Sequence, residues 1–455
     1  MTTAAAIETK PAFAFDDEWR RFGNWLLTWV VMTNIGFVAL WFVGAPPRFF
    51  DIVVAGFVGL IVKRFPFWLR YISFAGFMVW TVLKFVGGLF SLTMSSLLYS
   101  IQFFLELKPE NSVEYIGVGV VILLILGLAF KVIRRDQNFA NPWMILGGAA
   151  AFLSLAALDI QMGKDMRGHY FRSAPEGAVF GSASSKSGFI AGTDGKRHLM
   201  LVIVESLGVP KDNAEMNRLL FAHYKESAAV GARYDVSQGT TPFYNSTTAG
   251  EVRELCGRWG DYYDLLDKKD AGCLPAQLAK KGYATEAVHS FVGSFFKREE
   301  WYPNIGFEKR SFASDLKGQG ARPCGGVFPG ACDRDVVKIL GEKLRAAKQP
   351  TFLYWLTLNS HLPVPPGLNL NVDKCARVSP KLAEEFPQIC RQFAIWNDID
   401  VAMVREITAK DFPDTDILIV GDHMPPFFDK HQRTQFDPET VPWLYLRRKD
   451  NSGAQ

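Results

Sequence analysis

This chain of 455 residues has little net charge, no cysteine in its first half and no long apolar run in its second half. A formal net charge of +4 gives no support to nucleic-acid binding, because proteins that bind nucleic acids usually concentrate basic residues in a stripe. No cysteine occurs before residue 250, and no long apolar run after residue 162. The first 20 residues are polar and have no apolar core, which argues against a cleavable signal peptide. By composition, a membrane half precedes a soluble half.

Apolar runs in the first 160 residues predict an α-helical membrane anchor of about five spans. A bilayer core needs roughly 17 to 25 apolar residues per helix, and four of the runs meet this length or nearly do. The run at 49–62 is shorter and is flanked by charge, so omitting it leaves four spans. The runs cover residues 22–45, 49–62, 71 to about 98, 115–133 and 143–158.

Loop charges favour the count of five. Lys and Arg residues precede the first run and lie between the second and third runs and between the fourth and fifth. The other connections are poor in positive charge or net acidic. Because cytoplasmic loops carry the excess of Lys and Arg, this alternation predicts that the chain starts in the cytoplasm and that everything after residue 160 lies outside.

The six cysteines lie in the half that this topology exports, where an even number indicates disulfides. Six cysteines allow fifteen pairings, among which local pairs would close short loops at modest entropic cost. The alternative is free, buried thiols. The local pairs are 256 with 273, 324 with 332, and 375 with 390.

Residues 161–196 are rich in Gly, Ser and Lys and are predicted to form a juxtamembrane helix and a linker. From residue 197 to 455, predicted strands and helices alternate. This alternation predicts an α/β domain with a mostly parallel sheet covered by helices on both faces. We expect strands at 199–205, 283–290, 351–361 and 414–423, and helices at 212–227, 274–282, 335–348 and 394–410.

Polar side chains follow the predicted strands, at the edge where open α/β sheets bind ligands. Glu205 follows LMLVIV, His289 follows YATEAV, and His361 follows TFLYWLTLNS. Asp422 and His423 follow ILIVG. A single residue of this kind is more often a turn or cap residue, but several at one edge suit a divalent cation such as zinc or manganese.

A second polar cluster, QGTTPFYNSTTAGEVRELCG at 238–257, is rich in hydroxyls and predicts a helix that starts near Thr247 or Thr248. Backbone N–H groups at a helix N-terminus favour anions. The simpler interpretation is that Ser246 or Thr247 caps the helix. A hydroxyl bound to a metal, however, loses its proton more readily and becomes a nucleophile toward phosphorus.

The motifs VIVESLG, STTAGEVRELCG and IVGDHMPP resemble those of the alkaline phosphatase/sulfatase superfamily. Within it, the chain resembles the membrane-anchored transferases of phospholipid head groups, namely lipoteichoic acid synthase, lipid A phosphoethanolamine transferase and the phosphoglycerol transferases of periplasmic glucans. The resemblance implies that Glu205, Asp422 and His423 bind zinc or manganese. It implies that Thr247 is both metal ligand and nucleophile, preferred to Thr248 because T-x-A-G-x-V-x-x-x-C-G is similar to the glucan phosphoglycerol transferase pattern.

Further segments agree with this resemblance. HSFVGSFFKREEWYPNIGF implies that His289, Phe296 and Arg298 lie near the substrate, with Phe296 where the family usually has Trp. LTLNSHLPVP implies that His361 contacts the phosphate or head group. His289 or His361 would act as acid or base, or would stabilise charge when protonated. GACDRDV resembles a short family segment in which the role of Asp333 stays open.

The implied activity is transfer of phosphoglycerol or phosphoethanolamine from phosphatidylglycerol or phosphatidylethanolamine, through a covalent phosphothreonine, to an envelope glycan or lipid acceptor. The implied location is the bacterial inner membrane, with the catalytic domain on the periplasmic or extracellular side. NSHLPVP and FFKREEWY favour phosphoglycerol, whereas six cysteines are more typical of the phosphoethanolamine group.

Two alternatives stay open. A membrane-tethered phosphodiesterase or sulfatase-like hydrolase would use water as the acceptor, and a pseudoenzyme would bind without catalysis. CLPAQ at 273–277 carries the Cys and Pro of the C/S-x-P-x-R motif that sulfatases mature to formylglycine. Gln277 replaces the Arg of that motif, which argues against a sulfatase.

Overall fold

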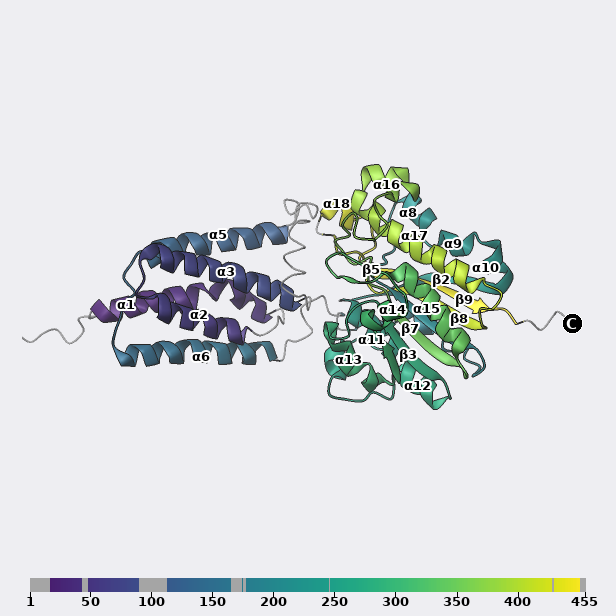
Figure 1. The fold of residues 1–455 in the computed structure, drawn as a ribbon, viewed down its shortest axis with the longest axis horizontal. Helices are drawn as coiled ribbons and strands as arrows, with labels where there is room; N and C mark the ends of the chain where they lie inside the picture. The colour runs from purple at the N-terminus through teal and green to yellow at the C-terminus, as the bar shows by residue number, and fades with distance from the viewer. Residues whose placement is uncertain are drawn as a thin grey trace, which may run out of the picture. The chain divides into compact units, whose positions relative to one another are not determined.

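The computed structural model describes residues 17–42, 48–89, 113–164, 174, 177–244, 246–427 and 429–450. These residues divide into two compact units, one made of residues up to 164 and one of residues from 174 onward. Figure 1 shows the first unit as a group of helices and the second as a sheet with helices around it. Each unit is described by itself below.

The regular structure in the described residues of the first unit is all helical and includes three helices long and apolar enough to cross a membrane. The candidate spans are Phe67–Val86, Ile116–Ile133 and Pro142–Met162. A further apolar helix, α2, has 14 residues. The elements are α1 (Asp17–Leu26), η1 (Leu27–Met32), η2 (Ile35–Phe42), α2 (Phe49–Val62), α3 (Phe67–Leu89), α5 (Val113–Ile133) and α6 (Pro142–Lys164).

The predicted five spans are therefore not confirmed. In the first predicted run, residues 22–26 end α1, and residues 27–42 form a π-helix and a 3₁₀-helix separated by a turn at Thr33 and Asn34, while residues 43–45 lie outside the described residues. Their side chains donate hydrogen bonds back to the carbonyls of Trp29 and Val30, at 2.8 and 2.9 Å, and such bonds compete with the helical ladder. The predicted extension of the third run beyond residue 89 lies outside the described residues.

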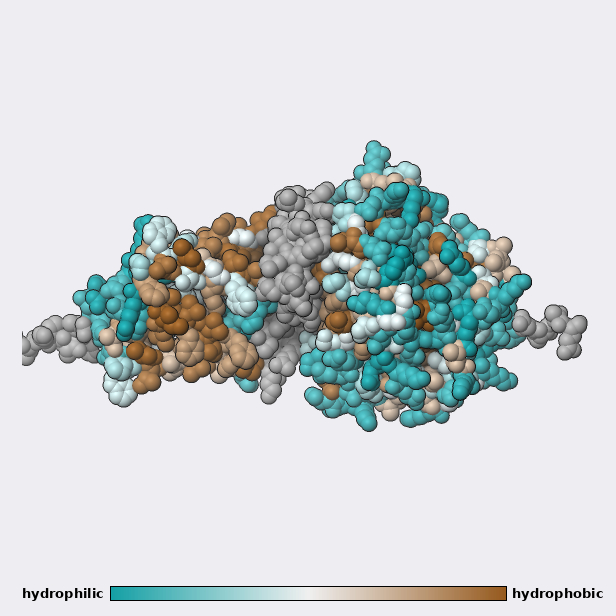
Figure 2. Space-filling view, viewed as in Figure 1, coloured by the Kyte–Doolittle hydropathy of each residue, from teal (hydrophilic) through white to brown (hydrophobic). Residues whose placement is uncertain are grey.

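Much of the outer surface of the first unit is apolar, and the charge inside its second predicted run is paired. Leu123 and Leu124 of α5 are more than half exposed, at 69% and 60%, and Figure 2 shows brown, hydrophobic surface over these helices. Asp51, whose charge makes the second run a weaker candidate span, forms an ion pair with Lys84 of α3, with 2.7 Å between Oδ1 and Nζ. Large exposed apolar surfaces of this kind mark contact with a membrane or another protein, and the three helices long and apolar enough to cross a membrane support a membrane protein.

The second unit is built on a seven-stranded sheet with the order β2-β9-β8-β1-β7-β3-β4. Strands β8, β1, β7, β3 and β4 run parallel, while β9 is antiparallel to both of its neighbours. The predicted, mostly parallel sheet is confirmed. The strands are β1 (His198–Val204), β2 (Tyr234–Pro242), β3 (Ala284–His289), β4 (Lys309–Ser311), β7 (Thr351–Leu356), β8 (Thr415–Gly421) and β9 (Thr440–Arg448), and a separate pair is β5 (Pro323–Cys324) with β6 (Gly330–Ala331).

Both faces of the sheet are buried. Along β1, Met200 and Val202 belong to one apolar cluster, while Leu201 and Ile203 belong to another. Strands buried on both faces read as continuous apolar runs, as LMLVIV does. The longer helices are α11 (Thr247–Cys256), α12 (Leu274–Lys280), α15 (Asp333–Ala346) and α17 (Pro387–Ile407), and the shorter ones are α7 (Ala183–Lys186), α8 (Ala214–Leu219), α9 (Ala222–Lys225), α10 (Ala228–Arg233), α13 (Arg298–Trp301), α14 (Ala313–Gly318), α16 (Pro380–Glu385) and α18 (Lys430–Arg433).

Two local predictions differ from the structure. The predicted helix at 212–227 is two short helices, α8 and α9, because Phe221 between them is in the left-handed region at φ 59°. Part of the predicted linker packs into the second unit, where Phe189 is fully buried in the core. The three local disulfides are confirmed as Cys256–Cys273, Cys324–Cys332 and Cys375–Cys390.

A pH-dependent stability is expected from Asp400 of α17, a half-buried residue that lines a pocket with Phe221 and Trp396. Burial raises the pKa of Asp400 from 3.8 to about 7. The folded protein therefore keeps a proton that the unfolded chain has already lost, and stability falls as the pH rises from about 4 to about 7. Asp400→Asn removes this loss, up to a ceiling of about 4 kcal/mol at about 1.4 kcal/mol per pKa unit.

Thermal unfolding of full-length protein and Asp400→Asn tests this expectation. The stability of the variant relative to wild type should grow between about pH 5 and pH 7 and then level off. A difference that is the same at both ends of this range would contradict it.

Candidate active site

The sheet topology brings the polar ends of its strands to one edge. Val204 of β1 pairs with Gly421 of β8, so that Glu205 and Asp422 leave adjacent strands side by side. His289 ends β3 opposite Leu356 of β7. Because all four strands are parallel, their carboxyl ends meet at the same edge, as the sequence predicts.

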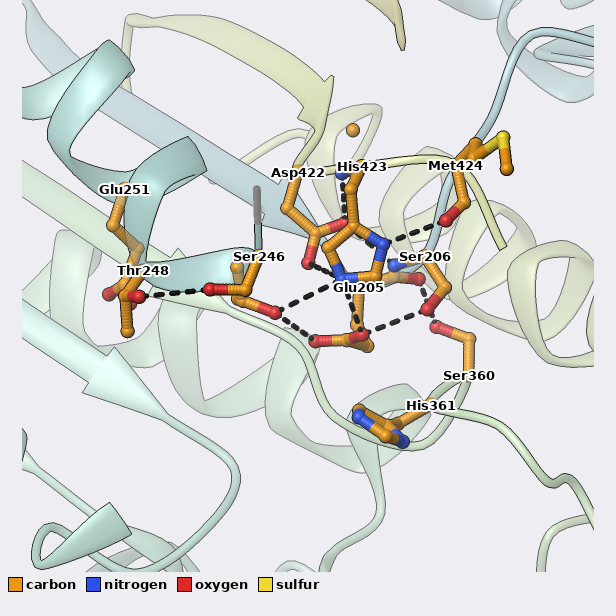
Figure 3. A network of polar contacts seen from close by, with 12 residues as sticks. Glu205, Ser206, Ser246, Thr248, Glu251, Ser360, His361, Asp422, His423 and Met424 are labelled. Carbon is orange, nitrogen blue, oxygen red and sulfur yellow. Dashed lines mark hydrogen bonds and ion pairs between the residues drawn. The ribbon is translucent and has the colours of Figure 1, made fainter. Parts of the chain in front are cut away.

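Glu205, Asp422 and His423 form a buried cluster (Figure 3), and Thr247 is buried in contact with it. His423 Nε2 lies 3.5 Å from Glu205 Oε1 and 3.4 Å from Asp422 Oδ2. Thr247 Oγ1 lies 3.1 Å from Glu205 Oε2 and 3.3 Å from His423 Nε2. One ligand atom from each of Glu205, Asp422 and His423 lies within 4.8 Å of the others. The structure thus brings together all four predicted metal ligands.

The donor set fits a divalent cation. Asp422 Oδ1 accepts hydrogen bonds from the N–H groups of Ser206 and His423, but buried Oδ2 has no hydrogen-bond partner among the described residues. His423 Nδ1 lies 2.8 Å from the carbonyl oxygen of Met424, which leaves Nε2 facing the cluster. Burial and the carboxylate of Glu205 raise the pKa of Asp422 to about 7. Two buried carboxylates and an imidazole are common metal-ligand types, and a divalent cation would supply the positive charge that balances the carboxylates.

Thr247 is the first residue of helix α11. Ser246 occupies the cap position, but its side chain makes no cap hydrogen bond, and its Oγ lies 3.1 Å from Thr248 Oγ1. Thr248 donates a 2.6 Å hydrogen bond to Asp261. Of the two adjacent threonines, Thr247 therefore contacts the ligand cluster, while Thr248 holds the neighbouring loop. At Gly250 a Cβ would meet Asp422 Cα at 3.1 Å, so glycine lets the helix approach the ligand strand closely.

A buried ion pair that sequence analysis missed connects α11 to the strand end that carries the predicted metal ligands Asp422 and His423. Arg253 donates to the carbonyl oxygens of Gly421 and Asp422, at 2.7 and 3.1 Å, and to Glu254 at 2.6 Å. Glu254 in turn accepts hydrogen bonds from the backbone of Ala183 and Ser184. Charged residues are almost never fully buried unless they are paired. The adjacent Arg253 and Glu254 in RELCG are the sequence signal from which this buried ion pair could have been predicted.

Arg298 does not point to open solvent. Its guanidinium is fully buried and pairs with Glu251 Oε2 at 2.7 Å. The hydroxyls of Tyr302 and Tyr354 donate to the other oxygen of Glu251. Phe296, half-buried and in the left-handed region, packs its ring against Tyr262 at 5.8 Å. The predicted contacts of Phe296 and Arg298 with substrate stay predictions.

We expect Arg298→Met to destabilise the second unit, by about 3–5 kcal/mol, because it leaves Glu251 buried without its partner. The double variant Glu251→Gln/Arg298→Met should lose less than the sum of the two single variants. Thermal unfolding of the three full-length proteins measures this coupling. Unchanged unfolding with a raised KM would instead assign Arg298 to substrate contact alone.

The two remaining predicted histidines lie at or beyond the carboxyl ends of β3 and β7. His289 is buried, with Nδ1 3.2 Å from the Leu356 carbonyl and Nε2 without a partner among the described residues. His361 Nδ1 lies 2.7 Å from the Leu362 carbonyl, and its ring packs on Phe328 at 4.2 Å. Burial lowers the pKa of His361 to about 4 and that of His289 well below its usual value. These lowered pKa values favour the neutral form of both imidazoles in the free protein, and the predicted roles of His289 and His361 stay predictions.

Asp333, whose role the sequence leaves open, supports the loop that carries His361. Its Oδ2 accepts hydrogen bonds from the N–H groups of Leu358 and Asn359, at 3.0 and 2.6 Å. Asn359 Oδ1 accepts a hydrogen bond from the Asp333 N–H at 2.8 Å. The carboxylate thus fixes the loop between β7 and His361, which makes Asp333 a positioning residue.

Comparison with known proteins agrees with this fold. The family model described as Sulfatase matches residues 199–443, more than half of the chain. The chain belongs to the sulfatase family. The predicted superfamily is thereby confirmed, and the matched range runs from β1 into β9, so it includes Glu205, Thr247, Asp422 and His423.

Individual relatives of this sulfatase-family chain are distant. A Rhizobium meliloti (strain 1021) protein named "Putative cyclic beta-1,2-glucan modification protein" is 23% identical over 163 residues, 34% of this chain and 24% of that protein. The chain thus matches about a quarter of the length of that relative. The structure of the lipoteichoic acid synthase LtaP from Listeria monocytogenes is similar over 59% of this chain and 72% of its own, with 16% identity and a TM-score of 0.45. The lipooligosaccharide phosphoethanolamine transferase A (EptA) from Neisseria meningitidis is similar over 94% and 88%, with 10% identity and a TM-score of 0.39.

The cysteine in the near-match to the sulfatase formylglycine motif has a structural role in this chain. Cys273 of CLPAQ is bonded to Cys256, and its side chain is buried. A cysteine held in a disulfide is not a nucleophile. Thr247, at a helix N-terminus and in contact with both Glu205 and His423, is the hydroxyl best placed for that role.

Proposed function

We propose that this chain is a metal-dependent transferase that moves phosphoglycerol or phosphoethanolamine from a membrane phospholipid, through phosphorylated Thr247, to an envelope glycan or lipid. The observation that carries the proposal is the position of Thr247 Oγ1, 3.1 Å from Glu205 and 3.3 Å from His423 at the N-terminus of α11. An adjacent carboxylate and imidazole favour loss of the proton of a hydroxyl and so activate it as a nucleophile.

The reaction consists of two displacements at phosphorus. Thr247 Oγ1 attacks the donor phosphodiester, the bond from phosphorus to the diacylglycerol oxygen breaks, and diacylglycerol leaves after taking up a proton. An acceptor hydroxyl then gives up its proton, attacks the phosphothreonine and restores the Thr247 hydroxyl. Free backbone N–H groups in the first turn of α11 favour the negative charge on the phosphoryl oxygens.

Glu205, Asp422, His423 and Thr247 would hold the zinc or manganese ion, which lowers the pKa of the nucleophile and neutralises phosphoryl charge when bound. Burial lowers the pKa values of His361 and His289, which favours the neutral imidazole as an acceptor rather than a donor of the first proton. The membrane anchor would keep the site at the leaflet that supplies phosphatidylglycerol or phosphatidylethanolamine. We place it in the bacterial inner membrane, with the catalytic unit on the periplasmic or extracellular side, as the alternation of loop charges favours.

Two sequence motifs support the choice of donor, and the name of one relative supports the choice of acceptor. NSHLPVP and FFKREEWY support phosphoglycerol as the transferred group. The name of the Rhizobium meliloti relative, a protein of cyclic beta-1,2-glucan modification, supports a glycan acceptor.

Product analysis tests this proposal. Full-length protein is incubated with zinc or manganese, vesicles of phosphatidylglycerol or phosphatidylethanolamine, and cyclic β-1,2-glucan, and products are identified by mass spectrometry. We expect diacylglycerol and a glucan that has gained glycerophosphate. Gain of phosphoethanolamine would keep the mechanism and reverse the donor, whereas free glycerophosphate with unmodified glucan would identify a hydrolase.

A further inference from the structure

A polar hollow of about 430 Å³ lies on the second unit, away from the ligand cluster. Its walls come from the ends of the β5–β6 hairpin and from the loop that follows His361. Pockets of 300 to 1,000 Å³ are the usual size for small-molecule sites, and these are mostly apolar. This one is polar, lined by Arg322, Arg334, Asn369, Asn371 and Asp373.

With Asp335, the partner of Arg322, this hollow has two positive and two negative side chains. Arg322 forms an ion pair with Asp335 at 2.8 Å, and Asp373 accepts a hydrogen bond from the Gly367 N–H. Arg334 makes no ion pair with any described residue and donates to the carbonyl and side-chain oxygens of Asn369, at 2.6 and 2.9 Å. A hollow with balanced charge and many hydrogen-bonding groups suits a neutral, polyhydroxylated ligand better than an anion.

The hollow is held in shape before any ligand arrives. Leu368, Asn369 and Asn371 all adopt left-handed backbone conformations, with φ of 57°, 62° and 62°. Such strain persists where the surroundings enforce it, and it clusters at ligand sites. Here Asn369 donates to the Pro323 carbonyl, and Gly325 N–H donates to Leu368. The Cys324–Cys332 bond closes the hairpin beneath them.

Both walls of the hollow lead to the candidate active site. The hairpin carries Phe328, whose ring packs on His361 at 4.2 Å. The loop reaches Gly367 only six residues after His361, a span of at most about 20 Å. A chain-like ligand could therefore reach from the hollow to the cluster.

We propose that this hollow binds a sugar residue of the acceptor glycan, at a distance from the hydroxyl that receives the transferred group. The part of this inference that concerns the transfer reaction rests on the proposed function, whereas the binding of a sugar does not. Polar planar groups from Arg, Asn and Asp would donate to and accept from sugar hydroxyls, and the preformed loop reduces the entropy lost on binding. The site would raise affinity for the acceptor and leave the first displacement, at the donor phospholipid, unchanged.

The test separates the two half-reactions in full-length protein with Arg334→Ala, Arg322→Ala and, as a matched control, the exposed Arg310→Ala on β4. Losing about 1 kcal/mol of hydrogen bonding should raise the KM for cyclic β-1,2-glucan roughly fivefold in the first two variants. The rate of phosphothreonine formation from phospholipid should stay that of wild type, which also shows that the variants are folded. The control should change neither.

Binding of cyclic β-1,2-glucan to full-length protein, measured by calorimetry without phospholipid, keeps the inference testable if no phosphothreonine ever forms. Weaker binding in Arg334→Ala and Arg322→Ala than in the control supports the hollow as a glycan site. Equal KM and equal glucan binding in all three variants would overturn it. Equal loss of both half-reactions would assign these arginines a structural role and would overturn it too.

Discussion

Replacing Thr247 by alanine is expected to lower head-group transfer by at least about a thousandfold, because the variant lacks the oxygen on which the covalent intermediate forms. The backbone N–H groups of α11 and the buried ligands would remain, so phospholipid should still bind with a KM near that of wild type. Release of diacylglycerol from labelled phospholipid measures the effect.

Thr248→Ala is the matched control for this substitution. It removes the same atoms from the next residue, whose hydroxyl donates to Asp261 rather than to the cluster. Loss of one such hydrogen bond costs about 1 kcal/mol and should reduce transfer by roughly tenfold or less. If Thr248→Ala were the inactive variant and Thr247→Ala the active one, the assignment of the nucleophile would be wrong.

Asp422→Ala is expected to weaken zinc or manganese binding by more than about a hundredfold. Loss of a group that only orients a metal ligand already weakens binding by up to about a hundredfold, and Asp422 is a predicted ligand itself. The carboxylate contributes the buried Oδ2 that has no hydrogen-bond partner among the described residues and lies 3.4 Å from His423 Nε2. Chelator competition measures the affinity directly and needs no activity. Transfer should fall in parallel and return on addition of excess metal.

Asp270→Ala serves as the control for metal binding. Asp270 also lies in a group of potential metal ligands, with Cys256 and Cys273, but those two cysteines form a disulfide. Their sulfurs are therefore not available as thiolate ligands. Asp270→Ala should leave the affinity for metal unchanged, and equal losses in both variants would contradict the placement of the metal site.

Much of the catalytic unit could be predicted because its local signals agree with the fold. The apolar runs before Glu205 and Asp422 are strands buried on both faces, and parallel pairing brings their ends together whatever the intervening helices do. The cysteine spacings indicate short closed loops, and all three local disulfides form. Resemblance to a family added what pattern could not, the preference for Thr247 over Thr248.

The parts that could not be predicted depend on contacts between residues distant in sequence. Glu251 and Arg253 belong to one short helix, yet their partners are Arg298 and the end of β8. The helical pattern at 212–227 gives no sign that Phe221 turns into the left-handed region, since its buried ring is fixed by tertiary packing. In the anchor, the side chains of Thr33 and Asn34 interrupt a run whose composition alone suits a span.

The intact mass of the protein after incubation with phospholipid and metal tests the central claim most directly. Full-length wild type, Thr247→Ala and Thr248→Ala are each incubated with zinc or manganese and with phosphatidylglycerol or phosphatidylethanolamine, without acceptor, and the modified peptide is sequenced. We expect added glycerophosphate on Thr247 in wild type and in Thr248→Ala, and none in Thr247→Ala. A group attached to another residue, or turnover of phospholipid with no attached group even when the reaction is stopped within one turnover, would contradict transfer through phosphorylated Thr247.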